Sequence, residues 1–304
     1  MALATVILLF GSKYLFIWLD PAQVADDPLL EKKTPYLNWQ FFLIRVAVFY
    51  VIWLFFKWKI IGNSIAQDAN GDEIFTRSNL PWSIAFVALF ALSYSFHSVD
   101  TLMSLQPHWF STMFGVYCLA GMLQSSVAVM ILFTVWLMKN NAFGGAVNEN
   151  HLHDLGKYLK AFTVFWAYIA FSQFMLIWYA NLPEETEFYL HRSHHGWMAV
   201  SLSLIFFKFI VPFIALLPRW AKRSPRYLVA VSVLLLVMQL VDNYWLVYPN
   251  FNDNHVVFGL LEVGTFLFFL GLFLMAVTRF MSRHNAVPVK DPRLQESLQH
   301  VVTY

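Results

Sequence analysis

Ionisable side chains interrupt several long apolar stretches of this sequence, and their types suit proton transfer. His97 and Asp100 are three residues apart, so a helix would place them on one face. A carboxylate beside an imidazole raises the pKa of that imidazole towards neutrality, which would allow the pair to relay a proton. The alternative is a structural hydrogen bond near the end of a helix. Both interpretations stay open on the sequence alone.

Other polar side chains interrupt the apolar stretches at comparable depth. The predicted outer half also holds Arg45, Gln173, Asp242 and Glu262, and the predicted inner half holds Lys160 and Lys208. Because a charge in hydrocarbon is costly, Glu262 should be protonated or ion-paired, and Arg45 should pair with one of the acids. Asp242 could instead be an interfacial acid among aromatic residues. Lys208 could line an inner water pathway or extend towards the nearby surface.

Composition indicates what must position these side chains. Hydrophobic residues make up 59% of the 304-residue chain and charged residues only 12%, against about 25% charged residues in soluble proteins. This shortage of charge excludes an ordinary cytosolic enzyme, a disordered protein and a nucleic-acid-binding protein. A net charge of +2 offers no polyanion-binding face. The sequence therefore predicts an all-α membrane protein.

Eight apolar stretches approach the length of about 20 residues that a helix needs to cross a bilayer. They are 2–19, 38–60, 81–105, 109–138, 158–181, 195–217, 227–248 and 255–281. The first is short and carries Lys13, so it is expected to be part of a longer helix or a short peripheral span. Pro81, Pro107 and Pro183 are expected to end stretches. The predicted fold is a polytopic transmembrane helix bundle over residues 1–282, in two four-helix-bundle-like halves, followed by a tail over residues 283–304.

The positions of lysine and arginine predict the orientation. Most lie in segments 57–80, 139–157 and 219–226 and after residue 278, whereas the opposite loops hold only Lys32, Lys33 and Arg192. Basic residues favour the cytoplasmic side, so both termini are expected in the cytoplasm, with the tail 283–304 as a cytoplasmic segment.

The predicted outer surface has an acidic segment that contains Glu184, Glu185 and Glu187. It could be a docking face for a basic partner, a collector of protons or a solvated loop, and His108 is a further candidate for partner contact. A single cysteine excludes a disulfide framework and a cysteine-ligated cluster held by this chain alone, and the histidines lack the spacing of a metal site. No bound metal is expected.

Two longer motifs carry a family resemblance. They are the string Asp100-Thr101-Leu102-Met103-Ser104-Leu105-Gln106-Pro107-His108-Trp109-Phe110-Ser111-Thr112 and the stretch from His153 through Phe165-Trp166-Ala167-Tyr168 to Pro183-Glu184-Glu185-Thr186. Both resemble the NrfD/PsrC-like integral membrane subunits of bacterial alternative complex III, a quinol:cytochrome c oxidoreductase. Val241-Asp242-Asn243-Tyr244-Trp245 and the tail with Lys290-Asp291-Pro292-Arg293 are more similar to the F-type than to the C-type subunit.

The resemblance implies a multi-pass subunit of the bacterial inner membrane that works with partner subunits. These would be a sister NrfD-like subunit, an iron–sulfur subunit, cytochrome c subunits and surrounding lipid, with a terminal oxidase as a further candidate. Haem c and the iron–sulfur clusters would belong to partner subunits, so this chain would hold no redox cofactor, although it could bind quinone or quinol. Family members usually have ten spans, which implies that an N-terminal pair is missing or encoded elsewhere.

Two functions follow as expectations. In the first, His97, Asp100, Asp242, Glu262 and Arg45 form an outer site that faces quinol or conducts its protons. In the second, the chain is a structural or proton-translocating scaffold without a quinone site, and Lys160 and Lys208 give inner access. Thr101 stands where the family usually has tryptophan, which weakens a quinone-ring pocket at that position. A stand-alone transporter is disfavoured because no pair of short, interrupted helices is evident at mid-membrane.

Overall fold

The computed structural model describes residues 2–252 and 255–302, so residue 1 and residues 303–304, the ends of the predicted membrane region and tail, lie outside the description. The described residues form helices joined by turns, without a strand. Within these residues, seven helical segments are long and apolar enough to cross a membrane: Trp39–Asn70, Ile74–Leu105, Phe114–Lys139, Glu149–Ala180, Trp197–Ala215, Pro225–Asn250 and Leu260–Met281. The predicted all-α polytopic bundle is confirmed.

Six of these crossings are built on one long helix each. They are α4 (Trp39–Asn70), α5 (Ile74–Thr101), α6 (Phe114–Lys139), α7 (Glu149–Ala180), α12 (Pro225–Val247) and α13 (Leu260–Met281). The seventh joins α9 (Trp197–Ser203), the π-helical segment η3 (Leu204–Ile210) and α10 (Val211–Ala215). Short helices complete the chain: α1 (Ala2–Leu15), η1 (Ile17–Leu19), α2 (Pro21–Asp26), α3 (Pro28–Lys33), η2 (Met103–Leu105), α8 (Pro183–His191), α11 (Arg219–Arg223), η4 (Tyr248–Asn250) and α14 (Leu294–Leu298).

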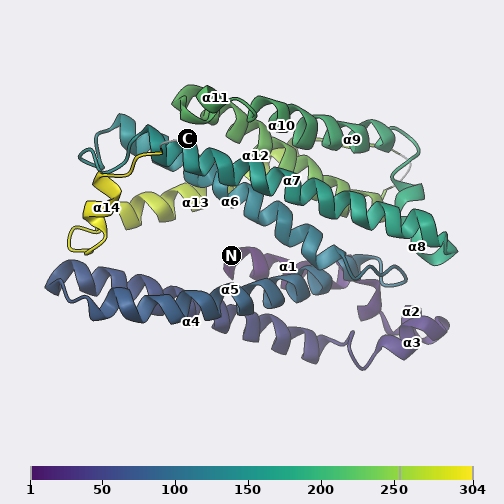
Figure 1. Ribbon diagram of the computed structural model, residues 1–304. Coiled ribbons are helices and arrows are strands. Elements are labelled where there is room, and N and C mark those ends of the chain that lie inside the picture. Colours follow the sequence, from purple (N-terminus) through teal and green to yellow (C-terminus); the bar gives the residue numbers. More distant parts are fainter. Residues whose placement is uncertain (1, 253–254, 303–304) are drawn as a thin grey trace.

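The first predicted span, residues 2–19, is not among the seven. Its helix α1 has 14 residues, which corresponds to about 21 Å at 1.5 Å per residue. Figure 1 shows that α1 begins roughly midway along the bundle and runs to the end where α2, α3 and α8 gather. This end is called the α8 end below, and the opposite one the α14 end.

The predicted stop at Pro81 is wrong, because Pro81 lies inside α5, which begins at Ile74. The helix continues past the apolar stretch because polar side chains pair it with α4. Asn63 donates to Asn79 (2.8 Å) and Gln67 donates to Thr76 (2.6 Å). The same pairing extends α4 ten residues beyond the predicted end at residue 60, to Asn70.

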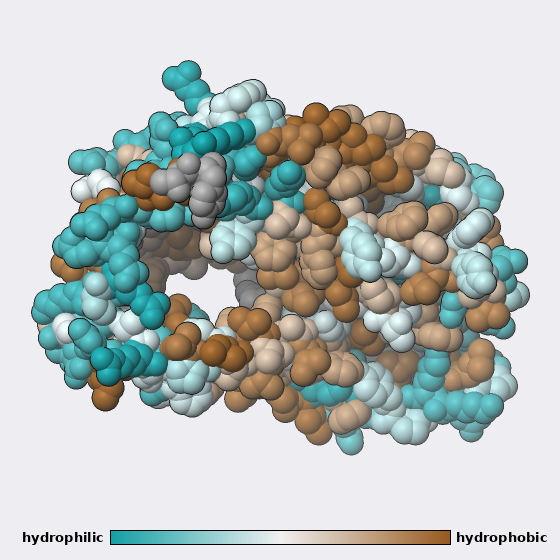
Figure 2. Space-filling model, in the orientation of Figure 1, coloured by the Kyte–Doolittle hydropathy of each residue, from teal (hydrophilic) through white to brown (hydrophobic). Residues whose placement is uncertain are grey.

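The helices pack as two groups (Figure 1). The crossing α9–η3–α10 joins α6, α7 and α12 in a four-helix bundle, whereas α4 and α5 form a pair that packs on α6 through α5. In the second group the described chain thus supplies the α4–α5 pair with α1 rather than a complete four-helix bundle. Helix α13 lies at the periphery with no buried residue, and it contacts α6 where the rings of Phe133 and Phe273 meet at 6.0 Å. Figure 2 shows an opening between α13 and the α4–α5 pair.

Two apolar clusters fill the four-helix bundle, one towards each end. An aromatic cluster at the α8 end includes Trp166, Trp197 and Trp245, and an aliphatic cluster towards the α14 end includes Ile131 and Leu228. Polar residues lie between the two clusters, near the middle of the bundle. One example is the fully buried pair in which Gln124 of α6 donates a hydrogen bond to Thr163 of α7 (3.0 Å).

The predicted tail packs across the α14 end. Lys290 donates to the carbonyl of Ala69 at the end of α4 (2.6 Å). Further along, His300 pairs with Asp154 of α7 (2.7 Å), and Arg219 donates to the carbonyl of Val302 (3.1 Å). Residues 290–302, named the strap here, therefore connect the α4–α5 pair to the four-helix bundle.

Candidate functional site

A buried ion pair lies at the centre of the four-helix bundle. The Lys208 ammonium and the Asp242 carboxylate are 2.5 Å apart, and their side chains are 0% and 1% exposed. The sequence predicted Lys208 near the inner surface and Asp242 in the outer half, but the two meet near the middle of their crossings. Lys208 therefore does not extend towards the surface, and Asp242 is not an interfacial acid.

Three further side chains surround this pair. The hydroxyl of Tyr117 donates to Asp242, and Lys208 also donates to the amide oxygen of Gln239 (2.8 Å). The Lys208 ammonium lies 4.2 Å from the ring centroid of Trp166, a distance at which cation–π attraction operates. The charges thus receive hydrogen bonds and an aromatic face in place of water, as buried ions require.

Local structure explains how Lys208 reaches Asp242. The residue lies within the π-helical segment η3, whose wider turn changes the direction of the side chains that follow. Gly121 of α6 lets Gln239 approach, because a Cβ atom at this position would lie 2.8 Å from the amide oxygen of Gln239. Neither feature is visible in the hydropathy pattern.

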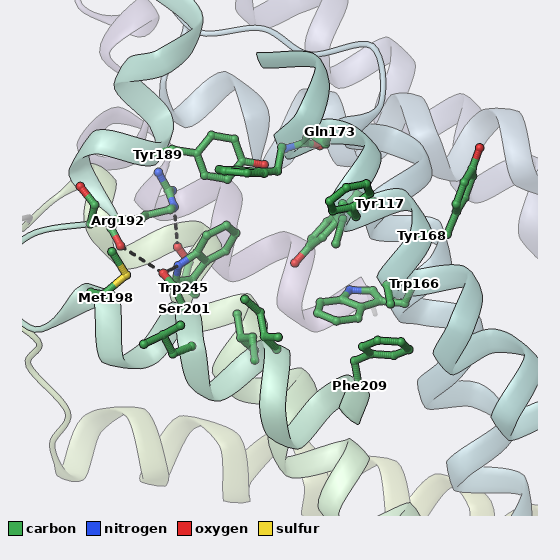
Figure 3. Close-up of a pocket in the computed structure, with 18 of the residues that line it drawn as sticks. Tyr117, Trp166, Tyr168, Gln173, Tyr189, Arg192, Met198, Ser201, Phe209 and Trp245 are labelled. Atoms are coloured by element: carbon green, nitrogen blue, oxygen red, sulfur yellow. Dashed lines mark hydrogen bonds between the residues drawn. The ribbon is translucent and has the colours of Figure 1, made fainter. Parts of the chain in front are cut away.

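A cavity of about 710 Å³ adjoins the ion pair. Its inner wall is formed by buried Tyr117, Trp166 and Trp245, and its mouth by exposed Tyr168 and Ile205 on the outer surface of the bundle. Figure 3 shows these aromatic side chains around the pocket. Two of them contact the ion pair, because Tyr117 donates to Asp242 and the Trp166 ring lies against Lys208. The cavity therefore opens sideways, where an apolar molecule in the bilayer could enter it.

Polar side chains line the α8 end of this cavity. Ser201 accepts from Trp245 (2.8 Å) and donates to the carbonyl of Arg192 (3.1 Å). The amide oxygen of Gln173 is buried with no hydrogen-bond partner among the described residues. Burial raises the pKa of Tyr189. This end can present hydrogen bonds to a ligand, whereas the rest of the cavity is apolar.

Arg192 is a buried cation at the same end, although the sequence placed it in a loop. Its guanidinium donates to the carbonyls of Phe188, Trp245 and Leu246 at 2.8–2.9 Å. The last two belong to the end of α12, where the helix dipole favours a positive charge. Burial lowers the pKa of Arg192 to about 9.

A second ion pair joins α4 to α5. Arg45 donates to both oxygens of Asp100 (2.8 and 3.1 Å), and Tyr36 donates to the same carboxylate (2.9 Å). The expectation that Arg45 pairs with an acid is confirmed. Burial and the Asp100 carboxylate raise the pKa of Tyr36 to about 12. Asp100 is engaged by these two donors rather than by His97.

His97 faces aromatic rings instead of a carboxylate. The rings of Phe49, Tyr50 and Trp53 lie 5.4–6.3 Å from its imidazole. Its Nδ1 atom is buried with no hydrogen-bond partner among the described residues. The predicted relay between His97 and Asp100 has no direct hydrogen bond to support it.

The remaining predicted residues lie outside both ion pairs. Glu262 is in the first turn of α13 rather than two turns inside, where it accepts from Tyr248 and from the backbone N–H of Gly259. Lys160 lies over the ring of Phe213, 5.4 Å from its centroid. The single outer cluster of His97, Asp100, Asp242, Glu262 and Arg45 is therefore not formed.

The predicted partner-facing residues lie at the α8 end. His108 pairs with Asp27 of the α2–α3 turn (2.8 Å), and Glu187 lies 3.3 Å from His191. Glu184 is exposed, and Glu185 is half-buried in the first turn of α8. Among the described residues, no group of three or more His, Cys, Asp or Glu side chains could hold a metal ion.

Several residues of the site were missed by reasoning from the sequence. Tyr117 and Asp242 are 125 positions apart, so no local spacing connects them. Gln239 precedes Asp242 by three positions on α12, and this helical spacing was an available signal. Arg192 was one of three basic residues in the loops predicted to face outwards, which was a sign that its charge has a specific role.

Comparison with known proteins does not identify a family for this chain. No protein-family model matches the sequence, and no curated protein is significantly similar to it.

Proposed function

We propose that this chain is an integral membrane subunit of a quinol:cytochrome c oxidoreductase of the alternative complex III type. In this proposal the cavity between α7 and α9–η3 receives a quinol ring, and the adjoining Tyr117, Asp242 and Lys208 handle its protons. One observation carries the proposal: a fully buried carboxylate–ammonium pair is connected by Tyr117 to the wall of an aromatic cavity that opens sideways.

The chemistry of quinol oxidation matches this arrangement. Oxidation of a quinol releases two electrons and two protons, so the site needs a group that accepts a proton and a partner that accepts electrons. Tyr117 lines the cavity and donates to Asp242, so a proton could pass from the ligand to the carboxylate by way of the phenol. The electrons would go to iron–sulfur and haem c groups on partner subunits, which the resemblance implies. The basic residues at the α14 end favour the cytoplasmic side of the membrane for that end.

The second candidate is a structural or proton-translocating scaffold that binds no quinone. The observation that favours it is the complete engagement of Asp100 by Arg45 and Tyr36, which is typical of an ion pair that stabilises packing. Under this alternative, the Lys208–Asp242 pair connects η3 to α12 in the same way, and lipid fills the cavity.

Variants of the two carboxylates separate these functions. Asp242→Asn in the assembled membrane complex should lower quinol oxidation about a hundredfold, the scale of a lost proton acceptor. Asp100→Asn is the matched control. Its turnover should stay within about twofold of wild type when the rate is expressed per assembled complex, and the bound haem content measures how much complex is assembled. Wild-type turnover in assembled Asp242→Asn complex would refute the proposed role.

A further inference from the structure

A second cavity, of about 430 Å³, lies near the α14 end between the end of α6 and the beginning of α12. Val135, Met138 and Lys139 of α6 line one side, and Ser224, Pro225 and Arg226 line the other. No carboxylate is among these residues. The cavity is separate from the aromatic cavity, which lies among α6, α7, α8, α9–η3 and α12.

The cavity brings two cations together without a counter-charge. Lys139 and Arg226 are both exposed, and neither forms an ion pair or a hydrogen bond within the part of the chain that is described. Ser224 precedes α12 and its hydroxyl does not cap the helix, so the backbone N–H groups of the first turn also lack a side-chain acceptor. All of these groups are donors or positive charges, and together they suit an anion.

The position of the cavity indicates where that anion comes from. Lys139 ends the apolar crossing α6, and Arg226 begins the apolar crossing α12. The cavity is therefore at the depth of the lipid head groups. Val135, Met138 and Pro225 give it an apolar floor, and the basic helix α11 directly precedes Ser224 in the chain. A phosphate attached to acyl chains matches this combination of charge and apolar wall.

We propose that this cavity binds the phosphate head group of an anionic phospholipid. Lys139, Arg226 and Ser224 hold the phosphate, and the acyl chains extend along the surfaces of α6 and α12. A free phosphate ion could satisfy the donors but would leave the apolar floor uncovered.

Native mass spectrometry of the full chain, delipidated in detergent, tests the proposal with three probes: phosphatidylglycerol, phosphatidylcholine and inorganic phosphate. The wild-type chain should retain phosphatidylglycerol in preference to phosphatidylcholine. Affinity should fall about fivefold for Lys139→Gln or Arg226→Gln and about 25-fold for the double variant. The charge-conserving variants Lys139→Arg and Arg226→Lys should stay within about twofold of wild type. Arg279→Gln, which removes an exposed cation in the last turn of α13, is the matched control and should have no effect.

Equal retention of the two lipids, or equal losses in the double variant and in Arg279→Gln, would overturn the proposal, because a general attraction to charge would then suffice. Binding of inorganic phosphate at the same sites without any lipid preference would overturn the lipid assignment as well. A melting temperature for each variant excludes loss of the fold as the cause of a reduced affinity.

Discussion

At the scale of single residues, the stability of the protein depends on both partners of the buried Lys208–Asp242 pair. Removing two charges from water costs several kcal/mol for each ion, and their attraction offsets this cost only if both partners are present. Tyr117 and Gln239 satisfy further hydrogen bonds of the pair. Removing one charge therefore leaves the other buried without a counter-charge, whereas neutralising both leaves no uncompensated charge in the bundle.

A double-mutant cycle should reveal this dependence. Lys208→Met and Asp242→Asn should each destabilise the detergent-solubilised protein by about 3–5 kcal/mol. The double variant should be destabilised by clearly less than the sum of the two. Chemical denaturation followed by circular dichroism measures the free energies.

The exposed pair of Glu73 and Arg77 is the control for this cycle, since their side chains are 63% and 82% exposed. Its coupling free energy should stay below about 1 kcal/mol. Additive effects of Lys208→Met and Asp242→Asn would show that the buried pair does not act as a unit.

Tyr36 gives a prediction about alkaline pH. Its pKa of about 12 in the folded protein exceeds the ordinary value of 10. A group with a raised pKa stabilises the fold fully below its unfolded pKa, so this contribution should be lost as the pH rises from about 10 to 12. Wild-type stability should therefore fall over this range more steeply than that of Tyr36→Phe. Parallel slopes of melting temperature against pH would contradict the assignment.

The sequence predicted part of this residue-scale picture. The cost of a buried charge was sufficient to predict that Arg45 pairs with an acid. It could not identify which acid, because the direction of a side chain around a helix depends on packing between helices. The pairing of Lys208 with Asp242 also depends on η3, and a π-helical turn has no signature in composition.

At the scale of helices, close approach between α5 and α6 depends on one glycine. A Cβ atom at Gly115 would lie 2.8 Å from the Cβ and 3.0 Å from the backbone oxygen of Ser95. Because a backbone atom cannot rotate away, a larger residue must separate the two helices. This contact joins the α4–α5 pair to the four-helix bundle.

Gly115→Ala should consequently destabilise the protein by about 1–3 kcal/mol, the usual cost of overpacking. Gly264→Ala in α13 is the matched control, since nothing lies within 4 Å of the added methyl group. It should be neutral or slightly stabilising, because alanine favours a helix more than glycine does. Thermal unfolding in detergent measures both, and equal melting temperatures would contradict a tight α5–α6 contact.

Helix positions were predicted well where the apolar length decided them and poorly where other forces did. The crossings from α4 to α13 were all expected, because about 20 apolar residues identify a span by themselves. The end of α4 and the beginning of α5 were not expected, since the Asn63–Asn79 and Gln67–Thr76 contacts continue these helices outside the apolar stretches. Helix α1 does not cross the membrane because its 14 residues are fewer than the about 20 that a crossing needs.

At the scale of the whole molecule, the strap connects the two groups of helices at the α14 end. Figure 1 shows that the strap, which includes α14, passes near the turn between α4 and α5 and reaches the beginning of α7. The opening between α13 and the α4–α5 pair lies beside it (Figure 2). The contacts of the strap with Ala69 and Asp154 therefore join the two groups across this opening.

Removal of the strap, by truncation after Val289, should increase amide hydrogen exchange in residues 66–71 and 146–154 at least about tenfold. Exchange in the buried core of α6 and α12 should stay unchanged, because their packing does not involve the strap. Hydrogen–deuterium exchange with mass spectrometry measures both regions. Unchanged protection at the end of α4 would show that the strap is not needed to hold that end.

The central claim is that a quinone ring enters the aromatic cavity beside Lys208 and Asp242. Photolabelling of the assembled membrane complex with an azido-quinone, followed by peptide mapping, tests it most directly. The account predicts labelled peptides from α7 around Tyr168 and from α9–η3 around Ile205, with competition by unmodified quinol. Label confined to other subunits, or to the α4–α5 pair around His97, would contradict it.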